Sequence, residues 1–546
     1  MKYIDKTYLG AVLIIALIVY VFGLLLDYSF AFKPMYYVRC TLDGSLFALP
    51  VLLVWGSTKR LFAIGWCILF AIFILVNYSY LLVFNNFMPL ECYTMFHNVN
   101  SVLIDSFLFS LKKGWLVLLP LAFVFLIKKG SKDKYRFLIL VAVLFSNMLF
   151  ITTEYCITVI NLKIKNQSIY NRYEYDDFYF GMPYFLVNGL TPYLYCFVKT
   201  GRFTSINTRQ YDYNAIDISS LPKYTDNRYA YAKGKSLIII FVESLSASVI
   251  NRKIKDGEIC PTLNRLFNDS TNISSFFNSQ AKAGASSDGH FIVNTGLLTL
   301  RNNVTANVIS EVPSLAKSKK WASAIVVTTD DKYFWNQYAT SLFYGYKENY
   351  YNEHIKKDGG YNDVIDPEVF DYGLKKVIER QNPFIAQFVT ISMHLPFHRA
   401  RENVKWIMDA DTIPETTRKY WNCTHFFDNC LNDFLNGLKS SGKYDDCVIA
   451  IMGDHSIPVN IVDDDHHMSA VIILNSGCPK DSIPHPKNMQ QIDIYPTLLD
   501  LIGGNEYGWK GVGHSIFRSD EPNDEEALYD LSQKLILSEY FQKTKF

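Results

Sequence analysis

The sequence SLIIIFVES occupies residues 236–244 and is a continuous apolar, β-rich run that stops at the polar pair Glu243-Ser244. Further apolar runs lie at residues 322–327, 384–391, 447–452 and 470–474, with helical patterns between them, for example at 368–380 and 424–439. Apolar strands that alternate with helices predict a largely parallel sheet covered on both faces. Such sheets bind ligands just beyond the carboxyl ends of their strands, so the residues at these ends are the first candidates for a site.

Polar side chains collect at these strand ends. The runs are followed in turn by Glu243-Ser244, by Thr328-Thr329-Asp330-Asp331, by Ser392-Met393-His394 and by Gly453-Asp454-His455. Carboxylates, neutral imidazoles and a hydroxyl form a ligand set suited to Zn²⁺ or Mn²⁺. A lone strand-end Glu or His is more often a capping or structural residue. The Gly-Asp-His triplet directly after a buried strand is the stronger signal, and it predicts that Asp454 and His455 bind a metal ion.

The segment GASSDGH at residues 284–290 leads into an apolar stretch and reads as a loop that enters a helix. A hydroxyl at a helix N-terminus lies among free backbone N–H groups that can also hold a phosphoryl oxygen. A nearby metal ion would lower the pKa of that hydroxyl and help to make it a nucleophile. The alternative is that Ser286 or Ser287 is simply a helix N-cap, which is the commonest role of Ser in this position.

The N-terminal third differs from the rest of the chain. Of the 546 residues 49% are hydrophobic, and most of this excess lies before about residue 155. Apolar stretches that predict membrane spans lie at residues 8–26, 40–55, 61–83, 115–127 and 137–159. The first is too long for a cleavable signal peptide and lacks a small-residue cleavage site. We therefore expect five spans within residues 1–159, a Tyr- and Asn-rich juxtamembrane linker at 160–235, and a globular domain at 236–546.

The distribution of basic residues predicts the orientation of these spans. Nine basic residues flank the ends assigned to the inside, against four on the other side. The positive-inside rule then puts the N-terminus in the cytoplasm, and five spans put the globular domain outside the cytoplasmic membrane. The alternative is that one of the short spans is a re-entrant or interfacial helix, which would place that domain inside.

Charge and cysteine content exclude several classes of function. Lys and Arg total 53 and Asp and Glu total 52, so there is no global positive charge that would predict a nucleic-acid partner. Ten Cys residues are too few for a disulfide scaffold. Cys423 and Cys430 could pair only if both face outward.

Several motifs together resemble a known family. They are Glu243-Ser244, CPTLNRL at 260–266, GASSDGHF at 284–291, FWNQ at 334–337, SMHLPF at 392–397, GDH at 453–455 and DIYPTLLDLIG at 493–503. In this order they look like the lipoteichoic acid synthase branch of the sulfatase/alkaline phosphatase superfamily. The resemblance covers the whole chain. It implies an α-helical transmembrane domain followed by an α/β alkaline phosphatase/sulfatase-like domain with a mostly parallel sheet.

The resemblance also implies roles for individual residues. Implied metal ligands are Glu243, Ser286, Asp454 and His455, holding one divalent ion, Mn²⁺ or Zn²⁺, with Mg²⁺ as an alternative. Ser286 stands where the family has a Thr nucleophile, and Trp335, Asn336 and His394 fall at substrate-binding positions. His467 precedes the last strand as a His does in related phosphoethanolamine transferases, although a surface His in an acidic loop explains it equally well.

Two positions depart from the family pattern. Thr328 replaces a His and Gln337 replaces an Arg, and both missing groups help to hold the phosphoglycerol donor in that family. The departures affect the predicted donor and leave the metal set and the hydroxyl in place. They therefore put a phosphoglycerol donor in question and leave the phosphotransfer chemistry standing.

The resulting prediction is a multi-pass enzyme of the cytoplasmic membrane with its catalytic domain on the extracytoplasmic side. It would transfer a phospho-headgroup, of the phosphoglycerol or phosphoethanolamine type, from a membrane phospholipid to an envelope glycan or lipid through a covalent Ser intermediate. A phosphodiesterase or phosphatase with the same metal set is the alternative, because water can replace the acceptor. A sulfatase ranks lower, since residues 286–290 lack the Pro and Arg of the C/S-x-P-S-R setting. A transporter or membrane scaffold would leave the polar strand ends unexplained.

Overall fold

The structure is a computed structural model of the whole chain. It describes residues 5–26, 34–84, 111, 114–128, 136–164, 212–219, 221–255, 257–282, 284–300, 305–307, 311–329, 332, 334–356, 364–395, 397, 413–457, 461–462 and 468–544. The chain divides into two compact units, Met1–Thr208 and Arg209–Phe546.

The first unit is helical. Its elements are α1 (Lys6–Leu26), α2 (Pro34–Phe47), α3 (Pro50–Leu53), α4 (Lys59–Phe84), the 3₁₀ helix η4 (Trp115–Leu126) and α6 (Arg136–Ile164). Apolar side chains of α1, α2, α4 and η4 form a common core. Large apolar side chains such as Leu61 and Phe137 remain exposed in this unit.

Two of the predicted spans have the length that a bilayer requires. Within the described residues, Lys6–Leu25 and Lys59–Ser79 are long and apolar enough to cross a membrane, whereas Trp115–Leu126 and Arg136–Phe150 are apolar but shorter. The predicted span at 40–55 is divided between α2 and α3, and Pro50 is the first residue of α3. The five-span arrangement therefore stays a prediction, and so do the three domain boundaries.

The second unit is built on a seven-stranded sheet in the order β4-β9-β8-β1-β7-β5-β6. The strands are β1 (Ser236–Val242), β4 (Ile273–Asn278), β5 (Ala324–Thr328), β6 (Glu348–Tyr350), β7 (Ile385–Val389), β8 (Cys447–Gly453) and β9 (Met468–Leu474). β8, β1, β7, β5 and β6 run parallel, and β9 is antiparallel to both β8 and β4. The short strands β2 (Lys253–Ile254) and β3 (Gly257–Glu258) form a separate antiparallel ribbon.

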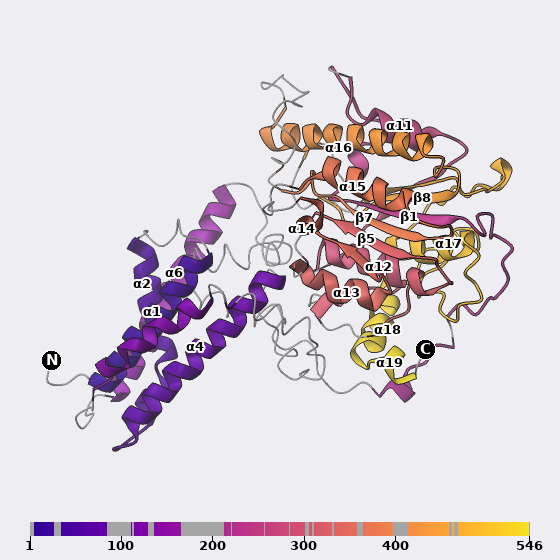
Figure 1. Cartoon of the computed structure of the whole chain (residues 1–546). Helices are drawn as coiled ribbons and strands as arrows, with labels where there is room; N and C mark the ends of the chain where they lie inside the picture. Colours follow the sequence, from indigo (N-terminus) through magenta and orange to yellow (C-terminus); the bar gives the residue numbers. More distant parts are fainter. Residues whose placement is uncertain are drawn as a thin grey trace. The chain divides into compact units, whose positions relative to one another are not determined.

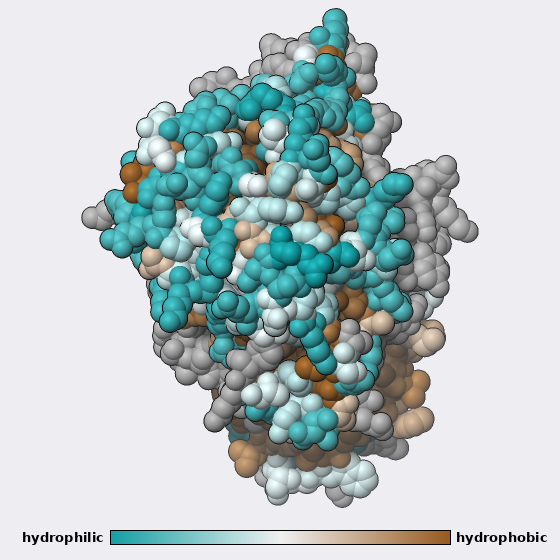
Figure 2. Space-filling view, turned by 90° about the vertical axis from the view of Figure 1, so that its right-hand side faces the viewer, coloured by the Kyte–Doolittle hydropathy of each residue, from teal (hydrophilic) through white to brown (hydrophobic). Residues whose placement is uncertain are grey.

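Helices cover both faces of this sheet. Figure 1 shows α11 (Pro261–Asn268), α15 (Asp366–Ile378) and α16 (Glu415–Ser440) on one face, and α12 (Ser286–Thr295), α13 (Gln337–Tyr344) and α17 (Ile494–Leu501) on the other. Other helices are α14 (Asn352–Ile355), α18 (Glu525–Leu537), α19 (Tyr540–Thr544) and the 3₁₀ turns η5 (Tyr213–Ala215), η6 (Ala247–Val249), η7 (Thr305–Asn307), η8 (Leu315–Lys317), η9 (Phe334–Asn336), η11 (Lys480–Ser482) and η12 (Gln491–Asp493). The face of this unit turned to the viewer in Figure 2 is mostly hydrophilic.

The predicted mostly parallel α/β sheet is confirmed. All five predicted strands are present, and the first has the predicted bounds. Two strands of the seven-stranded sheet were not predicted: β4, whose sequence ISSFFN is half polar, and the short edge strand β6. Cys423 and Cys430 do not face outward and do not pair, because both thiols are free and buried on α16. Residues seven apart on a helix are about 10 Å apart along its axis, which is too far for a disulfide.

Candidate functional site

The carboxyl ends of β1 and β8 bring the predicted ligands together. The two strands are neighbours in parallel register, with Val242 opposite Gly453, so Glu243 and Asp454 emerge side by side. The Glu243 backbone N–H donates to Thr390 Oγ1 beyond the end of β7 (3.1 Å). A Cβ at Gly453 would lie 2.1 Å from Ser469 Oγ, so only glycine allows this turn to pack against β9.

The third part of the site is the N-terminus of α12. Ser286 is the first residue of this helix, and neither it nor Ala285 makes a side-chain capping bond to the helix backbone. Gly289 lets the helix approach the β8 turn, since a Cβ there would lie 2.0 Å from the Asp454 carbonyl oxygen. The Asp288 carboxylate accepts from the N–H groups of Lys282 (3.0 Å) and Gly284 (2.8 Å) and so fixes the loop before Ser286.

Left-handed backbone conformations cluster around these groups. Ser244 (φ 51°), Ala285 (φ 44°), Trp335 (φ 50°) and Asn336 (φ 53°) all have positive φ values, which are unfavourable for residues with a Cβ. Ser244 and Ala285 directly adjoin Glu243 and Ser286. Such strain persists only where the surrounding structure enforces it, and it concentrates at functional sites.

The Ser286 hydroxyl lies between two of the predicted ligands. Ser286 Oγ donates to Glu243 Oε2 (3.2 Å) and lies 3.3 Å from His455 Nε2. His455 Nε2 in turn lies 3.4 Å from Glu243 Oε1 and 3.7 Å from Asp454 Oδ1. Glu243, Asp454 and His455 are all buried, and each offers a ligand atom within 4.8 Å of the others.

The donor chemistry of this cluster fits a divalent cation. His455 Nδ1 lies 2.7 Å from the Ser456 carbonyl oxygen. A carbonyl only accepts hydrogen bonds, so Nδ1 carries a proton, and Nε2 is the ring nitrogen that faces the two carboxylates and would offer its lone pair to a metal ion. Asp454 Oδ1 is oriented by the N–H groups of Ser244 (2.9 Å) and His455 (2.8 Å). Two carboxylate oxygens and one imidazole nitrogen are ligands that Zn²⁺ or Mn²⁺ accepts.

The pKa values in the cluster reflect its negative charge. Burial alone would lower the pKa of His455, but the charges of Asp454 and Glu243 raise it to about 10. Burial raises the pKa of Asp454. Burial would likewise raise the pKa of Glu243, but the hydrogen bond from His455 and the nearby imidazoles lower it. The cluster therefore favours a positive charge among its three side chains.

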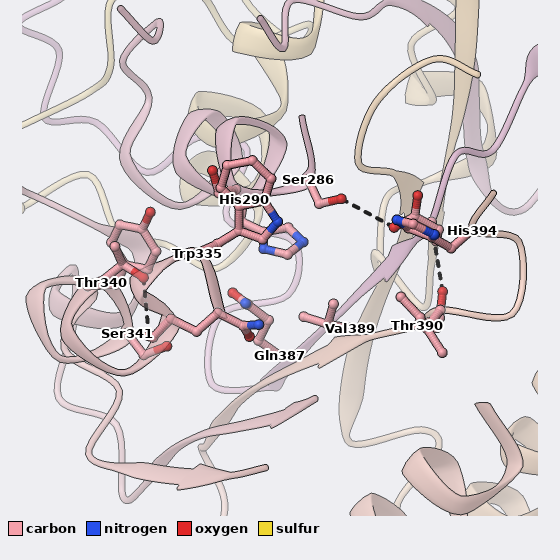
Figure 3. A pocket seen from close by; sticks show the side chains of 14 residues that line it. Ser286, His290, Trp335, Thr340, Ser341, Gln387, Val389, Thr390 and His394 are labelled. Carbon is pink, nitrogen blue, oxygen red and sulfur yellow. Dashed lines mark hydrogen bonds between the residues drawn. The ribbon is translucent and has the colours of Figure 1, made fainter. Parts of the chain in front are cut away.

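A pocket opens beside Ser286. Its lining comprises Glu243, Ser286, Ser287, His290, Trp335, Gln337, Thr340, Ser341, Tyr344, Gln387, Val389, Thr390, Ile391 and His394. Figure 3 shows Ser286, His290, Trp335, Gln387 and His394 around this space. His394 Nδ1 lies 2.6 Å from the Leu395 carbonyl oxygen, which fixes the orientation of its ring. Burial lowers the pKa of His290 to about 3, so this imidazole is neutral.

The predicted substrate-binding residues occupy different places. Trp335 and His394 line the pocket, whereas Asn336 does not and instead donates from Nδ2 to the Ala306 carbonyl oxygen (3.1 Å). His467 lies outside the described residues. His290 and Gln387 also line the pocket, and neither was assigned a role from the sequence. An amide within the otherwise apolar strand β7 is a signal that would have pointed to Gln387.

Comparison with known proteins identifies the second unit. Residues 235–504 match the sulfatase family, so this part of the chain is a sulfatase-family domain. The chain is homologous to lipoteichoic acid synthases. It is 26% identical to lipoteichoic acid synthase 1 of Bacillus subtilis over an alignment of 381 residues, and the match covers 62% of this chain and 57% of that protein. It is 24% identical to lipoteichoic acid synthase of Staphylococcus aureus over 375 residues, covering 61% and 56% of the two chains.

A solved structure of the lipoteichoic acid synthase LtaP from Listeria monocytogenes matches with a TM-score of 0.47 and 21% identity. The match covers 61% of this chain and 98% of that one. The chain thus spans a little over half the length of the relatives of known sequence that it matches.

Proposed function

We propose that this protein transfers a phospho-headgroup from a membrane phospholipid to a glycan or lipid acceptor of the cell envelope, with Ser286 as the nucleophile. The observation that carries the proposal is the position of the Ser286 hydroxyl. It lies at the N-terminus of α12, within hydrogen-bonding distance of both Glu243 and His455, and faces a pocket. A Ser that served only as a helix cap would bond to helix backbone amides instead.

Glu243, Asp454 and His455 would hold one divalent cation, Mn²⁺ or Zn²⁺, with Ser286 as a further ligand. Such a cation lowers the pKa of a neighbouring hydroxyl and neutralises charge on phosphoryl oxygens. The other contributions come from the chain itself. The Glu243 carboxylate accepts the hydrogen bond of Ser286 Oγ, and both residues line the pocket. At the start of α12 the N–H groups of Ser287 and Asp288 already donate to the carbonyl oxygens of Gly284 and Ala285. Among the described residues the Ser286 N–H therefore remains as the donor that this turn would offer to a phosphoryl oxygen.

The proposed reaction has two steps. In the first, Ser286 Oγ loses its proton and attacks phosphorus, the bond from phosphorus to the glycerolipid oxygen breaks, and that oxygen takes up a proton. In the second, an acceptor hydroxyl attacks the same phosphorus and Ser286 Oγ is released and reprotonated. His394 and Trp335 line the pocket and would contact the phosphate and its headgroup. We propose that the headgroup is of the phosphoglycerol or phosphoethanolamine type. The relatives are named lipoteichoic acid synthases, which supports an envelope glycan or lipid as the acceptor.

The helical unit supports a membrane setting. Two apolar helices of bilayer length precede the sulfatase-family domain in the chain. We propose that residues 1–159 span the cytoplasmic membrane five times and that the domain acts on the extracytoplasmic side, where envelope acceptors lie. A C-terminal reporter that is active only in the cytoplasm should then stay silent, and signal from it would contradict this topology.

Mass spectrometry of the full-length enzyme tests the mechanism. Incubation with phospholipid in the absence of acceptor should add the headgroup phosphate to Ser286, and the added mass identifies the headgroup. Ser286→Ala should form no adduct, whereas Ser287→Ala is the matched control that retains one. If Ser287→Ala abolishes the adduct and Ser286→Ala does not, the nucleophile is assigned to the wrong residue.

Headgroup release from labelled phospholipid separates transferase from hydrolase. A transferase should need an added acceptor for sustained release, whereas a phosphodiesterase should release the headgroup equally well without one. Turnover without any Ser286 adduct, even in rapidly quenched samples, would rule out the two-step mechanism.

A further inference from the structure

Gln387 is an unusual residue for its position. It lies in the middle of β7, a strand whose five residues are all buried, and it pairs with Ile239 of β1 and Val326 of β5. Only 3% of its surface is exposed. A buried amide is costly unless its polar atoms have partners, so both the Oε1 and the –NH₂ group of this side chain need a hydrogen-bond partner.

Asn294 of α12 satisfies one end of Gln387. Asn294 Nδ2 donates both to the His290 carbonyl oxygen (2.9 Å) and to Gln387 Oε1 (2.8 Å). The His290 carbonyl can only accept, so the orientation of the Asn294 amide is fixed by chemistry. Tyr346 completes the arrangement by donating from its hydroxyl to Asn294 Oδ1 (3.0 Å).

The other end of Gln387 is left for a ligand. With Oε1 facing Asn294, its –NH₂ group donates to no partner among the described residues, and Gln387 lines the pocket that contains Ser286. Ser286, His290 and Asn294 follow at intervals of four residues on α12 and so share one face of the helix. His290 Nε2 is buried in this pocket and also lacks a partner in the described part of the chain.

We infer that Gln387 is a specificity-determining residue, which donates from its –NH₂ group to an uncharged oxygen, such as a hydroxyl, on the group attached to the substrate phosphate. Asn294 is its positioning residue and acts only by holding the Gln387 amide in this orientation. An ammonium group is disfavoured at this point, because it presents N–H donors to another donor. The identity of the substrate as a phosphate ester rests on the proposed function, whereas the fixed donor does not.

Binding of small phosphate esters to the Mn²⁺-loaded full-length protein tests the inference without turnover. The probes are sn-glycerol-1-phosphate, n-propyl phosphate, which lacks the hydroxyls, and phosphoethanolamine, which carries an ammonium. The wild type should bind the glycerol ester about 5- to 10-fold more tightly than the propyl ester, which is the worth of one neutral hydrogen bond. Gln387→Met, which is similar in shape but makes no such bond, should remove this preference and leave the affinity for the propyl ester unchanged.

Gln387→Glu is the sharper variant, because it keeps an oxygen for Asn294 and replaces the pocket donor with an acceptor. It should strengthen binding of phosphoethanolamine relative to the glycerol ester, because the carboxylate forms a charged pair with the ammonium, whereas the hydroxyl can turn to donate to it only as a neutral group. Tyr346→Phe should change the preference by less than about 2-fold, since the His290 carbonyl still fixes Asn294. In steady-state assays Gln387→Met should raise KM for a hydroxylated donor lipid with little change in kcat.

Metal content and thermal melting of each variant report on folding. Equal affinity of the wild type for the glycerol and propyl esters would overturn the inference, and so would a Gln387→Met protein that keeps the preference or loses affinity for both esters alike. If the preference behaves as expected but no headgroup is ever transferred, the proposed function fails and the role of Gln387 stands.

Discussion

Glu243, Asp454 and His455 can be compared with a second set of buried charges in the same unit, Asp500 and Arg518. Asp500 is fully buried, and Arg518 meets it with two hydrogen bonds, Nε to Oδ2 (2.8 Å) and Nη2 to Oδ1 (2.7 Å). Arg518 also donates to Asp226 and lies 3.6 Å over the Tyr224 ring. The side chain thus ties residues 224–226 to the end of α17.

The two sets handle negative charge in opposite ways. Around Asp500 a permanent cation forms a forked pair, so every strong acceptor is used and the set serves stability. Around Glu243 and Asp454 the described residues supply no Lys or Arg contact, and the nearest positive charge is a His that must take up a proton. A buried carboxylate pair whose charged partner is titratable is therefore available to an external cation.

Removing negative charge from the cluster of Glu243, Asp454 and His455 should have the greatest consequence. Asp454→Asn keeps an oxygen for the Ser244 and His455 N–H groups but loses the negative charge. We expect bound metal to be lost and turnover to fall by about 10³-fold or more, since metal stabilisation of a transition state is worth several kcal/mol. Elemental analysis and turnover assays measure both. Full metal occupancy in Asp454→Asn or in His455→Ala would exclude that residue as a ligand.

The next effect should appear in stability rather than in catalysis. Arg518→Leu leaves Asp500 buried without its cation, which should cost about 3 kcal/mol of unfolding free energy. Denaturant unfolding of the detergent-solubilised protein measures this loss. Arg518→Lys should lie in between, because an ammonium cannot reproduce the fork. Turnover and metal content per folded molecule should match the wild type; a fall in either would show that the two sets are coupled.

Asp366 provides a third case, a buried carboxyl that no Lys or Arg of the described residues contacts. Its Oδ1 accepts from the N–H groups of Ile391 and Ser392, in the loop that leads to His394. Burial raises the pKa of Asp366 from 3.8 to about 6. A raised carboxyl pKa in the folded state means that its stabilising contribution is present below pH 4 and is lost as the pH rises through 6.

Asp366→Asn keeps the acceptor and removes the titration. We therefore expect its melting temperature to exceed that of the wild type by a few degrees at pH 7, corresponding to about 1–2 kcal/mol, and to match it at pH 4. Melting curves across this pH range provide the measurement. A wild type that is more stable than the variant at pH 7 would show that the ionised Asp366 carboxylate has a partner whose interaction exceeds the free-energy cost of burying its charge.

The sequence predicted the parts of this fold that depend on local pattern. Apolar strands such as SLIIIFV and CVIAIMG are recognisable alone, and the polar residues after them follow from the rule that ligands lie at carboxyl strand ends. β4 was missed because half of its residues are polar, including the buried Ser275, and because its pairing with β9 is a long-range choice. The sheet order, which makes β1 and β8 neighbours, likewise depends on contacts far apart in the sequence.

Within the site, the sequence identified residues at strand ends but not residues that a helix brings to a strand. The orientation of the Gln387 amide depends on its hydrogen bond to Asn294, which lies 93 residues earlier in the chain, and no spacing rule connects the two residues. Asn336 was included because it adjoins Trp335, yet its side chain turns to the Ala306 carbonyl. Adjacent residues in a turn point in different directions, which a motif alone does not resolve.

Ser286→Thr should change turnover least, and it tests whether the reaction needs only a hydroxyl at this position. Ser286→Thr keeps Oγ and adds one methyl group at a position that is only half-buried, so the hydrogen bonds to Glu243 and His455 can persist. We expect turnover to fall by less than about 10-fold, because overpacking one methyl group costs 1–3 kcal/mol in a closed core and less where a side chain faces a pocket. The adduct should then form on Thr at this position. Turnover as low as that of Ser286→Ala, with metal still bound, would show that the pocket wall around Oγ is too tight for a branched side chain. The geometry of the attack, rather than the presence of a hydroxyl, would then limit the reaction.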